Sequence, residues 1–239
     1  MNGIDCFFTG FRLAREPGLR QYILIPLAIN FLVLGIVMFY GFSQYDGLVA
    51  AITGWLPDWL AFLAGVMTFL AAVMIFAVGI YVFTMLANII ASPFNAILSE
   101  KVEERLVPGL ERQSPGVMLI VGRSVAREFS KLMYLLPRLI GLLLLSVIPG
   151  INALAPFAWI LFGAWMMAIQ YVDYGADNNQ VSFSELKSRL GQARWQALLF
   201  GLVVYFVLAI PLVNLFLIPI AVSGGTVLWV EHLRQKSEK

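Results

Sequence analysis

A short polar turn near the start of the chain has the residue types that bind an oxyanion. Pro17-Gly18-Leu19-Arg20 stands directly before an uncharged run that begins near Gln21. Backbone N–H groups and the positive dipole end at a helix start attract anions, and an adjacent arginine can donate two parallel hydrogen bonds. Gly18 would let the backbone approach such a ligand closely. The alternative is that Arg20 only marks the cytoplasmic end of a helix, which topology alone would require.

Neutral polar side chains in the hydrophobic parts of the chain are the candidates for lining a solute path. They are Asn30, Thr84, Asn88, Ser92, Asn95, Asn152 and Asn214, and Glu103 is added from the polar segment that follows the second hydrophobic run. The hydrophobic runs contain no Asp, Glu, Lys or Arg, although proton- or voltage-coupled transporters usually bury such groups. This pattern favours passive, channel-like conduction. For each residue alone, a hydrogen bond between helices is the commoner explanation.

Residues for catalysis are scarce. The one histidine, His232, lies near the end of the chain, and no HExxH, CxxC, GxSxG or Walker A pattern occurs. The one cysteine, Cys6, has no partner for a disulfide or a cysteine metal site within one chain, so we expect it to be a buried apolar residue. The sequence therefore predicts neither an enzyme nor an ATP-driven pump, and it gives no indication of a metal or cofactor.

The composition is that of an integral membrane protein. Of 239 residues, 60% are hydrophobic and 13% are charged, and the mean hydropathy is +0.85, whereas soluble domains carry roughly 25% charged residues. The net charge of +2 and the lack of a dense Lys/Arg run argue against a nucleic-acid partner. We treat residues 1–239 as one membrane domain, because no linker-like stretch divides them.

The positions of the basic residues predict the topology. All 16 Lys and Arg fall within residues 12–20, 101–138, 187–194 and 234–239. The loop between the first two hydrophobic runs carries Asp46 and Asp58 but no Lys or Arg, so the positive-inside rule places it outside the cell. Residues 22–45 and 59–91 then form two transmembrane helices, and both termini are cytoplasmic.

Two further hydrophobic runs, residues 139–172 and 195–230, begin and end at basic segments and must return to the same side. Ile148-Pro149-Gly150-Ile151-Asn152 interrupts the first, and Ile210-Pro211-Leu212-Val213-Asn214 interrupts the second. Residues 139–148 would span roughly 15 Å of helix, about half of the hydrocarbon layer, and residues 195–210 roughly 24 Å. We therefore predict re-entrant, half-penetrating hairpins. The repeated Pro and Asn pattern is typical of transporter solute sites, or simply of tight hairpin tips.

Residues 92–138 are predicted to form amphipathic cytoplasmic helices. Ser92 would cap a new helix with Pro93 in its first turn. Its apolar stripe would be Phe94, Ile97, Leu98, Val102 and Leu106, opposite Asn95, Ser99, Glu100, Glu103 and Glu104. A second helix would begin near Val117, with Arg123, Arg127 and Lys131 repeating every four residues to meet lipid headgroups, or otherwise a subunit or an anion.

Short motifs along nearly the whole chain resemble the CysZ family of bacterial inner-membrane sulfate permeases. They include Gly10-Phe11-Arg12-Leu13, Pro17-Gly18-Leu19-Arg20, Ala91-Ser92-Pro93-Phe94-Asn95, Glu100-Lys101-Val102-Glu103, Tyr134-Leu135-Leu136-Pro137-Arg138, Ile148-Pro149-Gly150-Ile151, Ala164-Trp165-Met166, Asp173-Tyr174 and Ile210-Pro211-Leu212-Val213-Asn214-Leu215-Phe216. The resemblance implies a permease for sulfate uptake that supplies sulfur for cysteine biosynthesis, and the missing Walker A loop makes an ATP-independent mechanism the expectation. It also implies an all-α fold with two long transmembrane helices and two half-penetrating hairpins, and assembly into homo-oligomers.

The same resemblance matches the family's sulfate site to Gly18, Leu19 and Arg20. Many relatives have a second arginine next, where this chain has Gln21. An amide there can donate a hydrogen bond but adds no charge, so the anion site would be altered. A non-transporting membrane scaffold, a permease for sulfite or thiosulfate, and a coupled carrier in place of a channel remain open alternatives.

Overall fold

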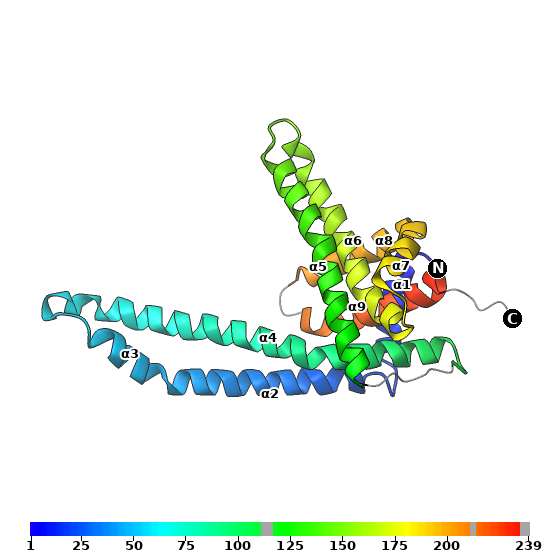
Figure 1. Ribbon diagram of the computed structural model, residues 1–239. Helices are drawn as coiled ribbons and strands as arrows, with labels where there is room; N and C mark the ends of the chain where they lie inside the picture. The colour runs from blue at the N-terminus through cyan, green and yellow to red at the C-terminus, as the bar shows by residue number, and fades with distance from the viewer. Residues whose placement is uncertain (111–116, 211–213, 235–239) are drawn as a thin grey trace. The chain divides into compact units, whose positions relative to one another are not determined.

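The computed structural model describes residues 1–110, 117–210 and 214–234, apart from the side chains of 58, 61, 84, 85, 87–90, 92, 117–125 and 214–216. Within these residues the chain is all-helical, which confirms the predicted fold class at that level (Figure 1). The α-helices are α1 (Gly3–Ala14), α2 (Gln21–Ser43), α3 (Tyr45–Thr53), α4 (Ala64–Leu106), α5 (Val117–Val147), α6 (Ala155–Asn178), α7 (Phe183–Gln192), α8 (Arg194–Leu208) and α9 (Asn214–Leu228). Short 3-10 helices lie at Asp58–Leu63 and Asn152–Leu154, and a π-helical turn at Trp229–Leu233 follows α9.

Several of these helices are long and apolar enough to cross a membrane. Among the described residues, four stretches meet this condition: Gln21–Thr53, Ala64–Phe83, Ala126–Val147 and Asn152–Asn178. Together, α7 and α8 would add a fifth, but they are bent by 101° at Ala193. The chain is therefore a membrane protein by its helices as well as by its composition.

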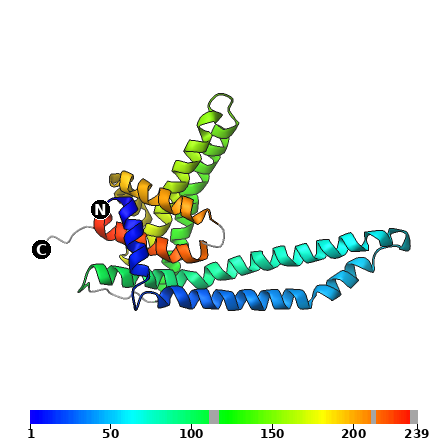
Figure 2. The same cartoon turned by 180° about the vertical axis from the view of Figure 1, so that it is seen from behind.

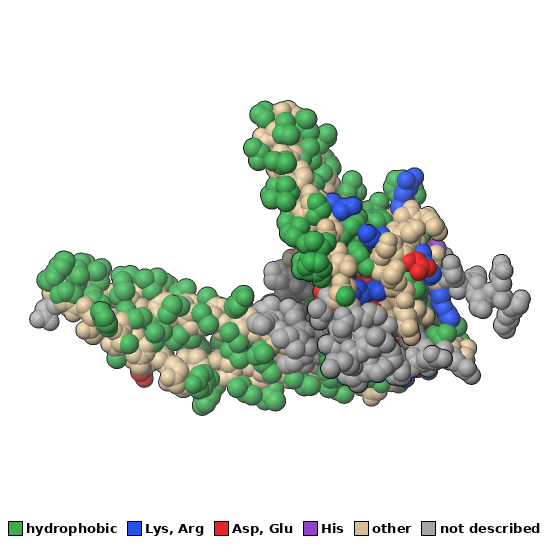
Figure 3. All heavy atoms as spheres, in the orientation of Figure 1, with side chains coloured by type: hydrophobic (Ala, Val, Ile, Leu, Met, Phe, Trp, Pro, Cys, Tyr) green, Lys and Arg blue, Asp and Glu red, His purple; other side chains and the backbone are tan. Residues whose placement is uncertain are grey.

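The contacts divide the chain into two compact units, and the unit of residues 24–94 consists of two long antiparallel helices joined by α3. The end of the Met38 side chain on α2 reaches α4 at Gly79, where a Cβ would lie 2.9 Å from Met38 Cε. Apolar side chains such as Phe39 and Phe69 are exposed in this unit. Figure 3 shows hydrophobic side chains along much of its visible surface. Such surfaces suit contact with lipid. That these helices cross the bilayer at residues 22–45 and 59–91 stays a prediction.

The predicted start of a new helix at Ser92-Pro93 is wrong, because α4 continues through Pro93 to Leu106. A proline inside a helix removes one backbone hydrogen bond and strains the preceding turn. Ending the helix there would instead leave up to four N–H and four C=O groups without partners inside the helix. Losing one hydrogen bond at Pro93 therefore costs less than creating two new helix ends. The helix continues from the apolar segment before Pro93 into the amphipathic segment after it.

The other unit, residues 1–23 and 95–239, packs α1 against α8 and α9 and packs α6 against α8 and α9 (Figures 1 and 2). Small residues permit this packing: a Cβ built on Gly10 would lie 2.2 Å from Gly224 N, so α1 and α9 touch backbone to backbone. Cys6 lies in this core with no exposed surface, as predicted. Asn2 and Asp5 form a capping box that fixes the start of α1.

The first predicted hairpin is present as α5 and α6, but its first arm is longer than expected. Because α5 runs unbroken from Val117 through Pro137 to Val147, it joins the predicted amphipathic helix and the first hairpin arm into one helix. The chain turns at Pro149-Gly150, where Gly150 has a φ of +85° that favours glycine. Hydrogen bonds from Trp159 Nε1 to Ser146 Oγ (3.1 Å) and from Trp165 Nε1 to Tyr134 Oη (2.9 Å) set the register of the two arms.

The second predicted hairpin corresponds to α8 and α9, each of 15 residues. Leu208 ends α8 and Asn214 begins α9, so the interruption falls where Pro211 predicts it. Residues 211–213 lie outside the described part of the chain, as does the side chain of Asn214. Pro219 does not interrupt the helix but lies inside α9.

Candidate anion-binding site

The predicted anion site lies in the turn between α1 and α2. α1 ends at Ala14, α2 begins at Gln21, and Gly18 adopts a φ of +93° between them. A Cβ added to Gly18 would meet no atom within 4 Å. The turn therefore needs glycine for its backbone conformation, which costs other residues about 1–3 kcal/mol, rather than for space.

Fewer backbone donors are free in this turn than the sequence indicates. The N–H groups of Leu19 and Arg20 both donate to Glu16 O, at 3.1 and 3.2 Å. Tyr22 N–H donates to Leu19 O, and Ile23 N–H donates to Arg20 O. Within the described residues, the N–H groups of Gly18 and Gln21 have no such backbone acceptor and remain available to a ligand. At most two backbone N–H groups are therefore free to bind an anion in this turn, fewer than a helix start without internal hydrogen bonds would offer.

A cavity of about 300 Å³ lies beside this turn. Its walls are formed by Pro17, Gly18, Leu19 and Tyr22 on one side and by Lys101, Glu104 and Arg105 on the other. The last three residues belong to the C-terminal end of α4, and Lys101 and Arg105 share a helix face because they are four residues apart. This second wall was not predicted from the sequence, since the spacing of Lys101 and Arg105 does not say which loop they face.

The cations of the cavity are partly neutralised. Lys101 Nζ lies 2.8 Å from Glu104 Oε2, and Arg105 Nε lies 3.2 Å from Glu16 Oε2. The hydrogen bond from Lys101 to Glu104 raises the pKa of the Lys101 ammonium, so this lysine stays charged well above neutral pH. All four side chains are largely exposed, so these ion pairs are weak and can open for a ligand. A bound tetrahedral anion would take the place of Glu104 or Glu16 as the partner of Lys101 or Arg105.

Arg20 and Gln21 do not line this cavity as the side chains stand in the structure. Both are solvent-exposed at the start of α2, whereas Leu19 is 5% exposed and anchors the turn. The structure therefore brings Gly18 and Leu19 together with Lys101 and Arg105, and leaves Arg20 and Gln21 at the outer edge.

The candidate path residues Asn95 and Glu103 are buried in helix contacts. Glu103 has no exposed surface, and its carboxylate accepts hydrogen bonds from Asn179 Nδ2 at 2.8 and 3.0 Å. Ser99, on the same face of α4, bonds Thr226 of α9 at 2.8 Å. The predicted amphipathic pattern is thus wrong in part, because Asn95, Ser99 and Glu103 are buried beside Leu98 and Val102. Polar partners on α6 and α9 make this burial favourable.

The remaining path candidates lie elsewhere or cannot be placed. Asn152 is exposed just after the turn that joins α5 to α6, in the 3-10 helix Asn152–Leu154. The side chains of Thr84, Asn88, Ser92 and Asn214 lie outside the described part of the structure. A solute path through these residues stays a prediction.

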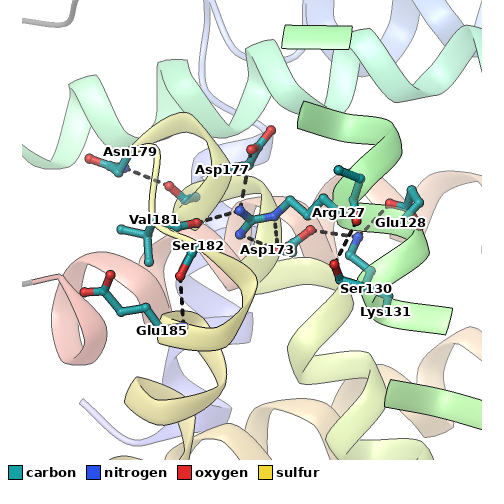
Figure 4. A network of polar contacts seen from close by, with 12 residues as sticks. Arg127, Glu128, Ser130, Lys131, Asp173, Asp177, Asn179, Val181, Ser182 and Glu185 are labelled. Atoms are coloured by element: carbon teal, nitrogen blue, oxygen red, sulfur yellow. Dashed lines mark hydrogen bonds and ion pairs between the residues drawn. The ribbon is translucent and has the colours of Figure 1, made fainter. Parts of the chain in front are cut away.

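A buried ion cluster at the base of α5 replaces the predicted contact with lipid headgroups (Figure 4). Arg127 Nε donates to Asp173 Oδ1 at 2.6 Å, and Lys131 Nζ lies 2.7 Å from Asp173 Oδ2. Arg127 also donates to the carbonyl of Val181 and lies 3.6 Å from Asp177. Arg127 and Lys131 are only 7% and 8% exposed, so the headgroup prediction is wrong for both. The four-residue repeat marked a helix face correctly, but it did not indicate that α6 supplies acidic partners.

The chain is similar to known proteins over nearly its full length. A sequence model of the family described as Sulfate transporter CysZ/Etoposide-induced protein 2.4 matches residues 6–219. A protein named Sulfate transporter CysZ from Pseudomonas aeruginosa (strain LESB58) is 43% identical over a 243-residue alignment, covering 100% of this chain and 97% of that relative. Proteins of the same name from Pseudomonas fluorescens (strain Pf-5) and Vibrio cholerae serotype O1 (strain M66-2) are 48% and 44% identical over 237 residues, covering 97% and 98% of this chain and 94% of each relative.

Proposed function

Since this chain belongs to the Sulfate transporter CysZ/Etoposide-induced protein 2.4 family, we propose that it is a permease that takes up sulfate through the membrane. The observation that carries the proposal is the similarity, at 43–48% identity, to proteins named Sulfate transporter CysZ along nearly their whole length. The helices that are long enough to span a membrane support a transport role. Uptake would take place at the bacterial inner membrane and supply sulfur for cysteine biosynthesis.

The proposed sulfate site is the cavity between the turn at Gly18 and the end of α4. Its chemistry suits a tetrahedral oxyanion, because Gly18, with a free N–H, and the cations Lys101 and Arg105 all line it. The free N–H of Gln21 lies at the outer edge of the same turn. Arg20 is exposed beside the turn and has a side chain long enough to close over a bound anion. Gln21 would contribute an uncharged donor. Sulfate would thus be held at the cytoplasmic start of the first transmembrane helix.

Conduction is proposed to be passive and channel-like. These 239 residues contain no Walker A loop for ATP, and no Asp, Glu, Lys or Arg interrupts residues 22–45 or 59–99. Two long helices and two short hairpins cannot easily enclose a polar path while every backbone group stays paired, so a homo-oligomer would be the conducting unit.

The hairpins are proposed to enter only part of the bilayer. Arg138 is the last charged residue of α5 before the tip, and the helix ends nine residues later at Val147. That distance is roughly 14 Å of helix, about half of the hydrocarbon layer. In the second hairpin, α8 and α9 have 15 residues each, or about 22 Å. These lengths favour partial insertion, whereas Ala126–Val147 and Asn152–Asn178, each taken whole, are long enough for a full crossing.

Sulfate flux into vesicles tests the proposed function. Protein reconstituted in lipid vesicles should admit labelled sulfate faster than protein-free vesicles, without ATP and without an imposed proton gradient. Excess sulfite and thiosulfate, added separately, would reveal related substrates by competition. Correctly inserted protein that leaves sulfate flux at the protein-free level would contradict the proposal and favour the scaffold alternative. Flux that requires a proton gradient would instead identify a coupled carrier.

Cysteine labelling tests the proposed topology. An impermeant thiol reagent outside the cell should label a cysteine at Gly47, in α3, but not one at Ser114 or Gln180, because the two hairpins return to the cytoplasm. Burial raises the pKa of the native Cys6 thiol to about 12, so Cys6 should stay unlabelled until the protein is denatured. External labelling at Gln180 would contradict the hairpins, and partial labelling of every site would indicate insertion in both orientations.

A further inference from the structure

A second hollow lies where the middle of α5, residues 129–138, meets the start of α7. Its volume is about 660 Å³. Tyr134 and Arg138 line it from α5, and Lys187 lines it from α7. The hollow is separate from the cavity at Gly18, which is lined by no residue of α5 or α7. It therefore needs an explanation of its own.

Two cations converge on one aromatic ring in this hollow. Arg138 Cζ lies 3.5 Å from the centroid of the Tyr134 ring, and Lys187 Nζ lies 5.0 Å from the same centroid. One guanidinium nitrogen of Arg138 donates to Tyr134 O at 2.8 Å, which leaves its other N–H groups for a ligand. Across the described residues, neither cation forms an ion pair with a carboxylate. Two positive charges without acidic partners favour an anionic ligand.

The same hollow has donors and acceptors for an oxyanion beside the cations. Ser182 and Ser184 line it at the start of α7. The Ser182 hydroxyl accepts a hydrogen bond from Glu185 N–H at 3.2 Å, so its own O–H is still free to donate. Phosphate oxygens are suitable acceptors for such a hydroxyl and for a two-pronged guanidinium.

The other wall of the hollow is apolar and exposed. Phe129 and Met133 line it and are 61% and 50% exposed. Exposed apolar side chains continue along α5 toward the tip, at Leu136, Ile140, Leu143, Leu144 and Val147. Figure 3 shows this hydrophobic cover on the α5–α6 hairpin, with Lys and Arg side chains toward its base. A free oxyanion would leave this apolar wall uncovered, whereas a lipid would cover it with acyl chains.

We propose that this hollow binds the phosphate of an anionic glycerophospholipid. Arg138 donates to two phosphate oxygens, Lys187 adds a second charge, and the acyl chains lie along the exposed face of α5 toward the hairpin tip. Arg138 and Lys187 would thereby fix the depth of the first hairpin. This site goes beyond sulfate uptake and does not depend on it.

Photo-crosslinking to a phosphatidylglycerol probe tests this site. The full-length protein is reconstituted in phosphatidylcholine vesicles that contain a minor fraction of photoactivatable phosphatidylglycerol, and the crosslinked peptides are mapped by mass spectrometry. The expected crosslinks fall in the peptides that carry residues 129–138 and 182–187. In Arg138→Gln/Lys187→Gln the yield at these peptides should fall about tenfold or more, because two charge-assisted contacts are lost.

A matched pair of substitutions controls for loss of charge. Arg15 and Arg194 are exposed and also lie over aromatic rings, at 3.8 Å from Phe11 and 5.9 Å from Trp195. Arg15→Gln/Arg194→Gln should keep the crosslinks at residues 129–138. The charge-preserving pair Arg138→Lys/Lys187→Arg should keep most of the yield, and it remains informative if the glutamine pair does not fold.

Competition separates the lipid from a soluble anion. Unlabelled phosphatidylglycerol should displace the probe, whereas additional phosphatidylcholine should not. Millimolar inorganic phosphate or sulfate should leave the crosslinks in place, because neither covers the apolar wall. Displacement by free phosphate or sulfate would overturn the proposal in favour of a soluble oxyanion site. Equal crosslinking in Arg138→Gln/Lys187→Gln and the parent would overturn it outright, whether or not the protein conducts sulfate.

Discussion

Arg20→Ala is expected to weaken sulfate binding about tenfold to a hundredfold, which corresponds to the ~1.5–3 kcal/mol of a charge-assisted hydrogen bond. Arg20 is exposed beside the turn at Gly18, where it can close over an anion in the adjacent cavity. Arg20→Lys should recover only part of the loss, because an ammonium keeps the charge but not the planar pair of donors. Isothermal titration or a sulfate-dependent melting shift of purified protein measures the effect.

Arg12→Ala is the control for this substitution. Arg12 is also exposed near the same turn, but its guanidinium bonds the Thr9 hydroxyl at 3.1 Å and does not line the cavity. Sulfate affinity should therefore stay at the parent level in Arg12→Ala. Insertion must be compared in both variants, because each removes a charge that sets the topology.

Arg105→Gln then tells which cation holds the anion. Arg105 lines the cavity and pairs with Glu16 at 3.2 Å, so a bound sulfate would have to draw it away from that carboxylate. If Arg20→Ala binds sulfate as well as the parent and Arg105→Gln does not, the end of α4 carries the site and the assignment of Arg20 is wrong. Full affinity in both variants would exclude the cavity as the sulfate site. Gln21→Arg should tighten binding if that position faces the anion.

The sequence was sufficient to predict the class of protein and the turn at Pro149-Gly150 that separates α5 from α6. Long uncharged runs follow directly from the cost of placing charge in lipid, so they are local signals. The break at Pro149-Gly150 was predictable for the same reason, since it depends on residues next to one another. Pro93 shows the limit of such signals. A proline raises the cost of a helix there, but the competing cost of two new helix ends depends on the whole length of α4.

The candidate sites were harder to predict because they depend on contacts between distant segments. Gly18 and Leu19 could be named from local residue types, but Lys101 and Arg105 enter the same cavity from residues far along the chain. Arg127 and Lys131 look like surface cations in the sequence, since their four-residue spacing also suits a lipid-facing helix. The packing of α5 against α6 brings Asp173 to both cations and shows that they are buried ion-pair partners rather than surface cations.

Asp173→Asn is expected to lower the free energy of unfolding by about 3–5 kcal/mol, the usual cost of removing one partner from a buried ion pair. Asp173 is 5% exposed and accepts from Arg127 on one oxygen and from Lys131 on the other, so the substitution makes both buried cations face an amide. The remaining acidic partners are Asp177, 3.6 Å from Arg127, and the exposed Glu128, 2.7 Å from Lys131. The structural consequence should be a loosened base of the α5–α6 hairpin, because this cluster joins α5 to the end of α6 and to Val181 before α7. Thermal and denaturant unfolding in one fixed detergent measure the change.

A second substitution separates this electrostatic cause from a simple loss of packing. Adding Lys131→Met to Asp173→Asn removes one of the two cations that lose Asp173 as a partner, so the double variant should regain part of the lost stability, whereas two independent packing defects would add. Glu185→Gln, which removes the half-exposed carboxylate that pairs with Arg189, should change the free energy of unfolding by less than about 1 kcal/mol. If Asp173→Asn is no more destabilising than Glu185→Gln, the cluster does not hold the hairpin. In that case apolar contacts such as Ala168 and Val172 of α6 must hold it in place.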